Sequence, residues 1–316
     1  MQHSKYVLNN VFLCYTSFHV TFSLAIIRKH SMRNCKILYL GNPELLDKFD
    51  YGAVERIIGF ASSLLYISKV RNKCHMYCAN FKMFKSRFLA KLLSPSQLYS
   101  FDDGLGTKWG AGYFYESDDS KLKSWALRLI AEPNYLSFWK ERVELHFTCY
   151  RVGSACLNKK TEFIGLRSLI ETQQESDATF FSDTLVILGN SCVEERMLSN
   201  VAYQSLLTNL VILAAEYKTI VYYSHPREEK EQPYFNFLPR EVVYIKNVGL
   251  AEKFIMTEAP SATVVSFYSS TSINLKALGF EKNYNYTSPA LDKIVGDIDK
   301  LKRFLLESGV KSFDEN

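Results

Sequence analysis

The sequence lacks the features that mark membrane-spanning, secreted and zinc-binding proteins. No window approaches the roughly 20 apolar residues that a membrane-spanning helix needs. The stretch before Tyr6 is too short and polar for a signal peptide. The seven cysteines include one close pair, Cys74 and Cys78, without the second pair or histidine cluster of a zinc site. We therefore expect reduced thiols and a cytoplasmic location.

Common signatures of nucleotide and nucleic-acid binding are also missing. No G-x-G-x-x-G follows the opening strand, which disfavours a dinucleotide-dependent dehydrogenase, and G-x-x-x-x-G-K-[ST] is absent. The net charge of +5 is mild and forms no long basic block, so no nucleic-acid partner is expected. The nearest approach to D-x-D is the acidic run at 116–119, which is interpreted as a solvated turn. No metal site is predicted.

Two kinds of surface contact stay open. Basic residues that alternate with apolar ones are typical of solvated helix faces, but they also suit the anionic inner face of the cytoplasmic membrane. These clusters are Lys82, Lys85, Arg87 and Lys91, and Lys121, Lys123 and Arg128. A helix with periodically spaced apolar residues is predicted over 290–307. It either packs against the first domain or forms a homodimer contact, and its apolar pattern is compatible with both.

What the chain does contain is a repeated alternation of apolar runs and helical patterns. Its 316 residues favour two domains, and its 47% hydrophobic and 22% charged residues are typical of a folded protein. The alternation predicts βαβ units and mostly parallel sheets. We expect a first domain over 1–155, a connection over 156–182 that contains a short helix near 166–175, and a second domain over 183–316.

The expected elements follow this division. In the first half we expect strands at 11–15, 36–40, 54–60, 74–78, 97–101 and 145–151, and helices at 16–29 and 119–145. In the second half we expect strands at 184–189, 219–224, 242–245 and 262–267, and helices at 201–217, 251–256 and 290–307. The fold class is therefore α/β, with two Rossmann-like domains facing each other across a cleft.

An acidic motif follows one of these strands. Asp102-Asp103-Gly104 comes directly after the strand at 97–101. In open α/β sheets, ligands bind beyond the carboxyl ends of the strands, so a paired acid at this position is a candidate general base. Asp and Gly are also common in turns, and a polar turn is the alternative.

Three features of the second half suit a nucleotide pocket. His225-Pro226 follows the strand at 219–224, and proline ends that strand. The hydroxyl run Ser269-Ser270-Thr271 lies at a helix start, where it either binds phosphate or only caps the helix. Glu252 begins the helix at 251–256, where it accepts hydrogen bonds from a ribose or is a surface acid.

Together these motifs carry a family resemblance. Asp102-Asp103-Gly104, His225-Pro226 and Ser269-Ser270 are similar to the three short motifs of bacterial sialyltransferases. With the chain length and the opening Val11-Phe12-Leu13-Cys14-Tyr15-Thr16-Ser17, the chain most resembles glycosyltransferase family 52, the lipooligosaccharide sialyltransferase family. The resemblance implies a GT-B fold, CMP-sialic acid as donor, and a terminal galactose of a surface glycan, lipooligosaccharide or capsule, as acceptor.

The resemblance also implies roles for individual residues. Asp102 or Asp103, with Asp103 preferred, would be the base; His225 would meet the CMP phosphate as an imidazolium, and Glu252 would bind the ribose. Ser269 and Ser270 would hold the phosphate. Gly189-Asn190-Ser191 is similar in position to a donor-contacting loop. Direct displacement would invert the anomeric carbon without a cofactor or metal. The alternatives are a GT-B enzyme with another nucleotide-sugar donor and a noncatalytic protein that binds nucleotides or glycans.

Overall fold

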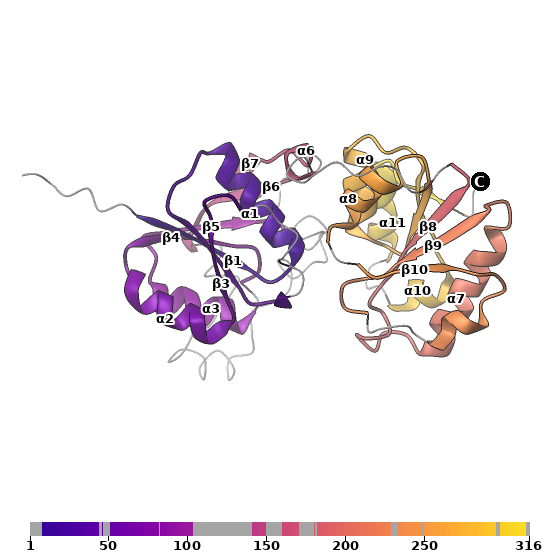
Figure 1. Cartoon of the computed structure of the whole chain (residues 1–316), viewed down its shortest axis with the longest axis horizontal. Helices are drawn as coiled ribbons and strands as arrows, with labels where there is room; N and C mark the ends of the chain where they lie inside the picture. Colours follow the sequence, from indigo (N-terminus) through magenta and orange to yellow (C-terminus); the bar gives the residue numbers. More distant parts are fainter. Residues whose placement is uncertain are drawn as a thin grey trace, which may run out of the picture. The chain divides into compact units, whose positions relative to one another are not determined.

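The chain forms two compact units, Met1–Gln173 and Gln174–Asn316 (Figure 1). The computed structural model describes residues 8–43, 46, 51–81, 83–103, 141–149, 160–170, 180, 182–228, 233–247, 249–294 and 298–313. Each unit is built on its own parallel β-sheet with helices beside it.

The first unit contains a seven-stranded parallel sheet in the order β3-β2-β1-β4-β5-β6-β7. Its strands are β1 (Asn9–Cys14), β2 (Cys35–Tyr39), β3 (Glu55–Ile58), β4 (Cys74–Cys78), β5 (Gln97–Phe101), β6 (Val143–Thr148) and β7 (Thr161–Phe163). The chain starts at β1 in the middle, runs outward to β3, and returns to β4 on the other side of β1. Loops diverge at such a switch point, which favours a binding site at the carboxyl ends of β1 and β4.

Helices cover both faces of this sheet. Helix α1 (Ser17–Lys29) lies on one face, and α2 (Phe60–Val70) and α3 (Phe84–Leu93) lie together on the other (Figure 1). The short helix α6 (Arg167–Ile170) follows β7. Side chains alternate along a strand, so Val11 and Leu13 of β1 join the α2 and α3 core. Burial on both faces explains why the strands are continuous apolar runs.

The second unit contains a six-stranded parallel sheet in the order β10-β9-β8-β11-β12-β13. Its strands are β8 (Thr184–Leu188), β9 (Thr219–Tyr223), β10 (Val243–Ile245), β11 (Thr263–Ser266), β12 (Asn283–Asn285) and β13 (Lys311–Ser312). Its helices are α7 (Asn200–Leu213), α8 (Ala251–Glu258), α9 (Ser270–Ala277), α10 (Pro289–Ile294), α11 (Ile298–Glu307) and the 3-10 helix η4 (Pro233–Phe237).

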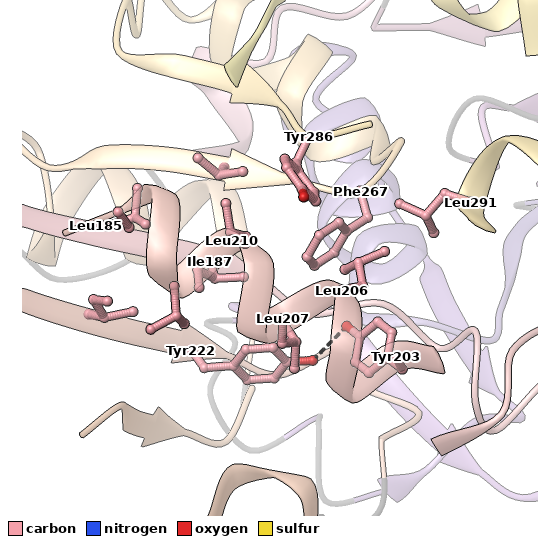
Figure 2. Close-up of a cluster of buried hydrophobic side chains, with 14 of the residues drawn as sticks. Leu185, Ile187, Tyr203, Leu206, Leu207, Leu210, Tyr222, Phe267, Tyr286 and Leu291 are labelled. Atoms are coloured by element: carbon pink, nitrogen blue, oxygen red, sulfur yellow. Dashed lines mark hydrogen bonds between the residues drawn. The ribbon is translucent and has the colours of Figure 1, made fainter. Parts of the chain in front are cut away.

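The core between β8 and α7 shows why this alternation folds as it does. Leu185 and Ile187 of β8 point toward Leu206 and Leu210 of α7, as Figure 2 shows. All five residues of β8 are buried. Removing this apolar surface from water is the main force that holds the helix on the sheet.

Most expected elements are present, and the differences have local causes. The strands at 74–78 and 97–101 are confirmed with the same bounds. The strand expected to reach residue 60 ends at Ile58, because Gly59 takes a left-handed φ of 86° and begins the turn into α2. The predicted end of the helix at residue 145 is wrong, because β6 already begins at Val143. Residues 119–140 lie outside the described residues.

Sequence patterns missed the shortest elements. Strands β7, β12 and β13 have three residues or fewer and are mostly polar, so no apolar run marks them, in contrast to the equally short β10. β7 and α6 lie in the segment expected as a connection; α6 falls within the short helix expected near 166–175, whereas β7, which pairs with β6 in the first sheet, was not expected. The helix expected over 290–307 is two helices, α10 and α11. Across the described ranges, no helix combines the length and apolar character needed to cross a bilayer.

Candidate functional site

The carboxyl ends of four neighbouring strands form a polar cluster in the first unit. The strands are β1, β4, β5 and β6, and the cluster includes both acids of the motif that follows β5. Gly104, the third member of that motif, lies outside the described residues. The structure separates the two acids, because their side chains enter different surroundings.

Asp102 is completely buried. Its Oδ1 accepts a hydrogen bond from Nε2 of His146 (3.0 Å), and its Oδ2 accepts from Oγ1 of Thr148 (2.9 Å) and the backbone N–H of Cys149 (2.7 Å). Nδ1 of His146 in turn lies 2.8 Å from Oγ of Ser100. A carboxylate enclosed in this way joins β5 to β6 and does not meet a substrate.

Asp103 keeps an accessible edge, with a side-chain exposure of 24%. Its Oδ1 lies 2.7 Å from Nε2 of His19, and its Oδ2 accepts from Nδ2 of Asn80 at 2.7 Å. Nδ1 of His19 accepts from the backbone N–H of Tyr15 (3.2 Å), which leaves the ring proton on Nε2 to be donated to Asp103. Within the described residues, these two donors orient the carboxylate, while the exposed part of its side chain can receive a proton.

Local structure explains why these two donors meet Asp103. The side chain of Thr16 caps α1 by accepting from the backbone N–H of His19 (3.2 Å), which places His19 in the first turn after β1. Asn80 follows β4, and its Oδ1 accepts from the backbone N–H of Met83 (3.3 Å). Neither residue was predicted from the sequence. A search for polar side chains just after each expected strand would have found them.

Three loops of the second unit also meet at one sheet edge. They follow β9, β8 and β11, which are neighbours in the sheet. The backbone N–H of Gly189 donates to the carbonyl of Tyr223 (2.8 Å), and Nδ2 of Asn190 donates to the carbonyl of Phe267 (2.9 Å). The structure therefore brings the Gly189-Asn190-Ser191 loop together with the His225 and Ser269 segments. The hydroxyl of Ser191 is buried and donates to Oε1 of Glu195 (2.8 Å).

His225 is half-buried in the loop after β9. Its Nδ1 accepts from the backbone N–H of Arg227 (3.2 Å), which leaves Nε2 as the ring donor. Burial and then the positive charge of Arg227 lower the pKa of His225 to about 4. At neutral pH the ligand-free protein therefore has a neutral imidazole here, in contrast to the imidazolium expected from the sequence. Pro226, the next residue, is exposed.

The hydroxyl segment after β11 combines a cap with an unusual backbone. Ser269 is the N-cap of α9, and its side chain accepts from the backbone N–H of Thr271 (3.2 Å). Tyr268 before it has a left-handed φ of 51°, and Oδ1 of Asn285 accepts from its N–H at 2.7 Å. Ser270 and Thr271 are partly exposed. The start of α9 therefore presents both backbone N–H groups and hydroxyls.

Glu252 lies in α8, which follows the edge strand β10. Its side chain is buried, with 7% exposure, and its Oε1 accepts from Nδ2 of Asn274 in α9 (2.7 Å). The structure thus ties Glu252 to the helix that Ser269 caps. This contact uses one carboxylate oxygen.

Glu228 is a buried acid that the sequence analysis did not single out. Its Oε1 accepts from the backbone N–H of His225 (2.8 Å) and its Oε2 accepts from the hydroxyl of Tyr222 (2.9 Å). The hydroxyl of Tyr222 lies 2.9 Å from that of Tyr203 (Figure 2), which accepts from the backbone N–H of Asn190 (3.2 Å). This chain joins the His225 loop to the Gly189 loop. Burial raises the pKa of Glu228 to about 7, although these two hydrogen bonds oppose the rise.

Glu228→Gln is expected to change how stability depends on pH. The pKa of Glu228 is about 7 in the folded protein against an ordinary 4.5, so the stability from its protonated form is complete below pH 4.5 and is lost as pH rises through 7. The wild type should therefore lose about 3 kcal/mol relative to Glu228→Gln across this window. Urea unfolding at pH 5 and pH 8 measures the difference. The lowered pKa of His225 makes stability rise with pH. This contribution is the same in both proteins, so it cancels when they are compared.

The matched control for this experiment is Glu241→Gln, which changes an exposed glutamate of the same unit. Its unfolding free energy should differ from the wild type by the same amount at both pH values. If the unfolding free energies of the wild type and Glu228→Gln also differed by the same amount at both pH values, this result would contradict the raised pKa of Glu228.

Gly189→Ala is expected to destabilise the second unit. A Cβ at Gly189 would lie 2.8 Å from the backbone N of His225 and 2.7 Å from the Tyr222 hydroxyl, and would also overlap Oε1 of Glu228. Backbone must shift to relieve this crowding, at a cost of about 1–3 kcal/mol. The matched control is Gly249→Ala, because a Cβ there meets nothing within 4 Å. Urea unfolding should show a loss for the first variant alone, and equal effects would contradict the close packing.

Within the ranges that the structure describes, no group of three or more His, Cys, Asp or Glu side chains is arranged to hold a metal ion. The free cysteines in these ranges, which include Cys74 and Cys78, are all buried. Burial raises the pKa of Cys74 to about 11, so this thiol stays protonated at neutral pH.

Comparisons with known proteins found a matching family model and solved structures with a similar fold. The model of glycosyltransferase family 52 matches residues 56–284. The chain is similar to the GT-B domain of a sialyltransferase from Photobacterium damselae, with a TM-score of 0.52, 10% identity, and coverage of 96% of this chain and 97% of that chain. It is also similar to S. aureus MnaA in a co-structure with UDP (TM-score 0.52, 10% identity, coverage 89% and 79%).

A third similar structure is the glycosyltransferase SnogD from Streptomyces nogalater, with a TM-score of 0.52, 10% identity, and coverage of 96% of this chain and 86% of that chain. A search of curated protein sequences found no match. At 10% identity, these structural similarities are evidence for the fold alone. The fold is of the GT-B type, with two parallel α/β sheets of seven and six strands.

Proposed function

Since the chain belongs to glycosyltransferase family 52, we propose that it is an inverting sialyltransferase that moves sialic acid from CMP-sialic acid to a terminal galactose of a bacterial surface glycan, lipooligosaccharide or capsule. The acidic, His-Pro and paired-serine motifs, which resemble those of bacterial sialyltransferases, support this choice of donor. The observation that carries the proposal is the accessible, doubly oriented carboxylate of Asp103.

Asp103 is the proposed general base. An acceptor hydroxyl is a poor nucleophile near neutral pH, and a carboxylate that removes its proton in the transition state contributes about 100- to 10,000-fold. The hydrogen bonds from His19 and Asn80 hold the carboxylate in one orientation, so little ordering remains for the transition state. Asp102 is assigned a structural role, because its hydrogen bonds join the end of β5 to β6 beside Asp103.

The three loops of the second unit are the proposed donor site. The start of α9, with the partly exposed residues Ser269, Ser270 and Thr271, suits the CMP phosphate, because a helix N-terminus favours negative charge. His225 donates from Nε2 to the same phosphate, and Glu252 accepts from the ribose hydroxyls. Gly189-Asn190-Ser191 lies beside His225 and completes this edge. The protein groups alone supply these donors, so the proposal needs no metal.

The reaction that follows is a direct displacement. The acceptor oxygen attacks the anomeric carbon of the sialic acid and forms the new glycosidic bond. The bond from that carbon to the phosphate oxygen breaks, and CMP leaves with its electron pair. The acceptor proton passes to Asp103. Attack from the face opposite to the leaving group converts CMP-β-sialate to an α-sialoside.

The test is nucleotide selectivity followed by turnover. Thermal-shift measurements with CMP, UDP and GDP should show stabilisation by CMP alone, since a ligand stabilises the folded state according to its concentration over its Kd. Transfer from CMP-sialic acid to lactose should then yield an α-sialoside. Stabilisation by UDP or GDP instead would indicate another donor, and no response to any of them would favour a noncatalytic binding protein.

A further inference from the structure

The charge of the chain is unevenly distributed, although it forms no uninterrupted basic block. No Asp or Glu occurs between Glu55 and Asp102, whereas this segment holds eight basic residues: Arg56, Lys69, Arg71, Lys73, Lys82, Lys85, Arg87 and Lys91. The rest of the chain then has 30 basic and 33 acidic residues. The net positive charge of the whole protein therefore comes from the segment that contains α2 and α3.

The outer sides of α2 and α3 also expose large apolar side chains. Leu65 of α2 is 71% exposed, and Met83 and Phe84 at the start of α3 are 45% and 42% exposed. Exposed lysines, Lys69 and Lys85, lie on the same helices. We call the surface formed by these five residues the α2–α3 face.

The basic clusters found in the sequence are only partly represented on this face. Arg87 is buried, with 2% exposure, so neither a solvated helix face nor a membrane surface, the two interpretations left open for its cluster, describes this residue. Lys82 lies outside the described residues, as do Lys121, Lys123 and Arg128.

Aromatic contacts join the two helices into one surface. The rings of Phe60 in α2 and Phe88 in α3 lie 6.0 Å apart, and Phe84 stacks on Phe88 with the centroids 5.9 Å apart. Nζ of Lys85 lies 5.8 Å from the centroid of Phe60. The helices run side by side on one face of the sheet (Figure 1), so their exposed residues lie on the same side of the unit.

We propose that the α2–α3 face binds the surface of a bilayer that contains anionic lipids. Leu65, Met83 and Phe84 suit the boundary between headgroups and acyl chains, and the lysines reach the headgroups above it. A second copy of the same face would be repelled, because the segment has no acidic residue to pair with its cations. A nucleic acid would match the charge but would leave the aliphatic side chains Leu65 and Met83 without apolar partners.

The face adjoins the candidate site of the first unit. Asn80, which donates to Asp103, also accepts from the backbone N–H of Met83. The hydroxyl of Ser86 in α3 lies 2.8 Å from that of Tyr15 after β1. If the face rests on a membrane, Asp103 lies close to the bilayer surface, which suits an acceptor glycan carried by a lipid. This consequence rests on the proposed function, whereas the membrane contact itself does not.

The test is cosedimentation of the full chain with vesicles. Vesicles of phosphatidylcholine with phosphatidylglycerol should bind the protein, and vesicles of phosphatidylcholine alone should bind it far more weakly. The double variant Lys69→Gln and Lys85→Gln should lose about 25-fold in affinity for the anionic vesicles, at about fivefold for each lysine. The matched control is Lys218→Gln with Lys246→Gln, exposed lysines of the second unit, which should bind as the wild type does. Both double variants should keep the wild-type melting temperature and the activity on soluble lactose.

Several results would overturn the proposal. They are absence of binding to anionic vesicles, equal binding to both kinds of vesicle, equal losses for the two double variants, and binding of a DNA duplex that excludes the vesicles. Phe84→Gln gives a second readout, because it should weaken the binding that persists when salt screens the lysines. Loss of lactose sialylation with intact vesicle binding would count against the proposed function alone.

Discussion

Asp103→Asn is expected to reduce the kcat for sialyl transfer to lactose by about 100- to 10,000-fold, because the amide cannot take the acceptor proton. The side chain keeps its shape, and its carbonyl oxygen can still accept from Nε2 of His19, so of its hydrogen bonds from His19 and Asn80 only the one from Nδ2 of Asn80 is lost. The KM for CMP-sialic acid and the melting temperature should therefore change little. Initial rates at saturating donor, with the thermal unfolding of the same preparation, measure the two expectations together.

The matched control is Asp299→Asn, an exposed acid in the second unit that should leave kcat unchanged. If the kcat of Asp103→Asn stays within a factor of about two of the wild-type kcat, the reduction is far smaller than the loss of a general base would cause. Asp103 would then have no role as the base. A fall in kcat accompanied by an equal fall in the folded fraction would likewise reject it, since the carboxylate would be acting through stability.

The second large effect is expected in stability, at the neighbouring acid. Asp102→Ala removes the acceptor for Nε2 of His146, the hydroxyl of Thr148 and the backbone N–H of Cys149. Each buried donor left without an acceptor costs about 1–3 kcal/mol, so the unfolding free energy should fall by about 3–5 kcal/mol. Urea unfolding measures this loss.

A graded pair of variants separates structure from catalysis at this position. Asp102→Asn should cost less than Asp102→Ala, because its carbonyl oxygen can replace Oδ2 and its amide can donate to His146 after a change of tautomer. The folded Asp102→Asn protein should retain most of its turnover. Asp103→Ala, at the partly exposed acid, should cost less stability than Asp102→Ala. A reversed order of stabilities would contradict the buried role of Asp102.

The sequence predicted much of the fold because its signals are local. An apolar run of five residues bounded by polar ones is visible without any tertiary information, and β4 and β5 were predicted with the observed bounds. The three-residue strand β10 lies in the apolar run at 242–245 and was predicted, whereas β7 (Thr-Glu-Phe) and β12 (Asn-Tyr-Asn) are mostly polar and were missed. The family inferred from three short motifs is confirmed by the match over residues 56–284.

The candidate site was predictable only in part. The acids after β5 and the hydroxyls before α9 stand out, because carboxylates and serines at the ends of apolar runs are visible in the sequence. The partners that orient them do not stand out. His19 is 84 residues from Asp103 and Asn80 is 23 residues away, and they meet only because β1 and β4 are neighbours in the sheet. Glu228 was missed for the same reason, since its burial comes from Tyr222 and Gly189.

By itself, the sequence determined that two adjacent carboxylates stand at the carboxyl end of a buried strand, because the apolar run ends at Phe101. Only the tertiary structure decided which of them is accessible. Consecutive side chains at a strand end point in opposite directions. Asp102 turns toward β6, where His146 and Thr148 enclose it, and Asp103 turns toward the start of α1, where an edge stays open. The direction of each acid depends on which strands flank β5, and that order is set by packing across the whole sheet.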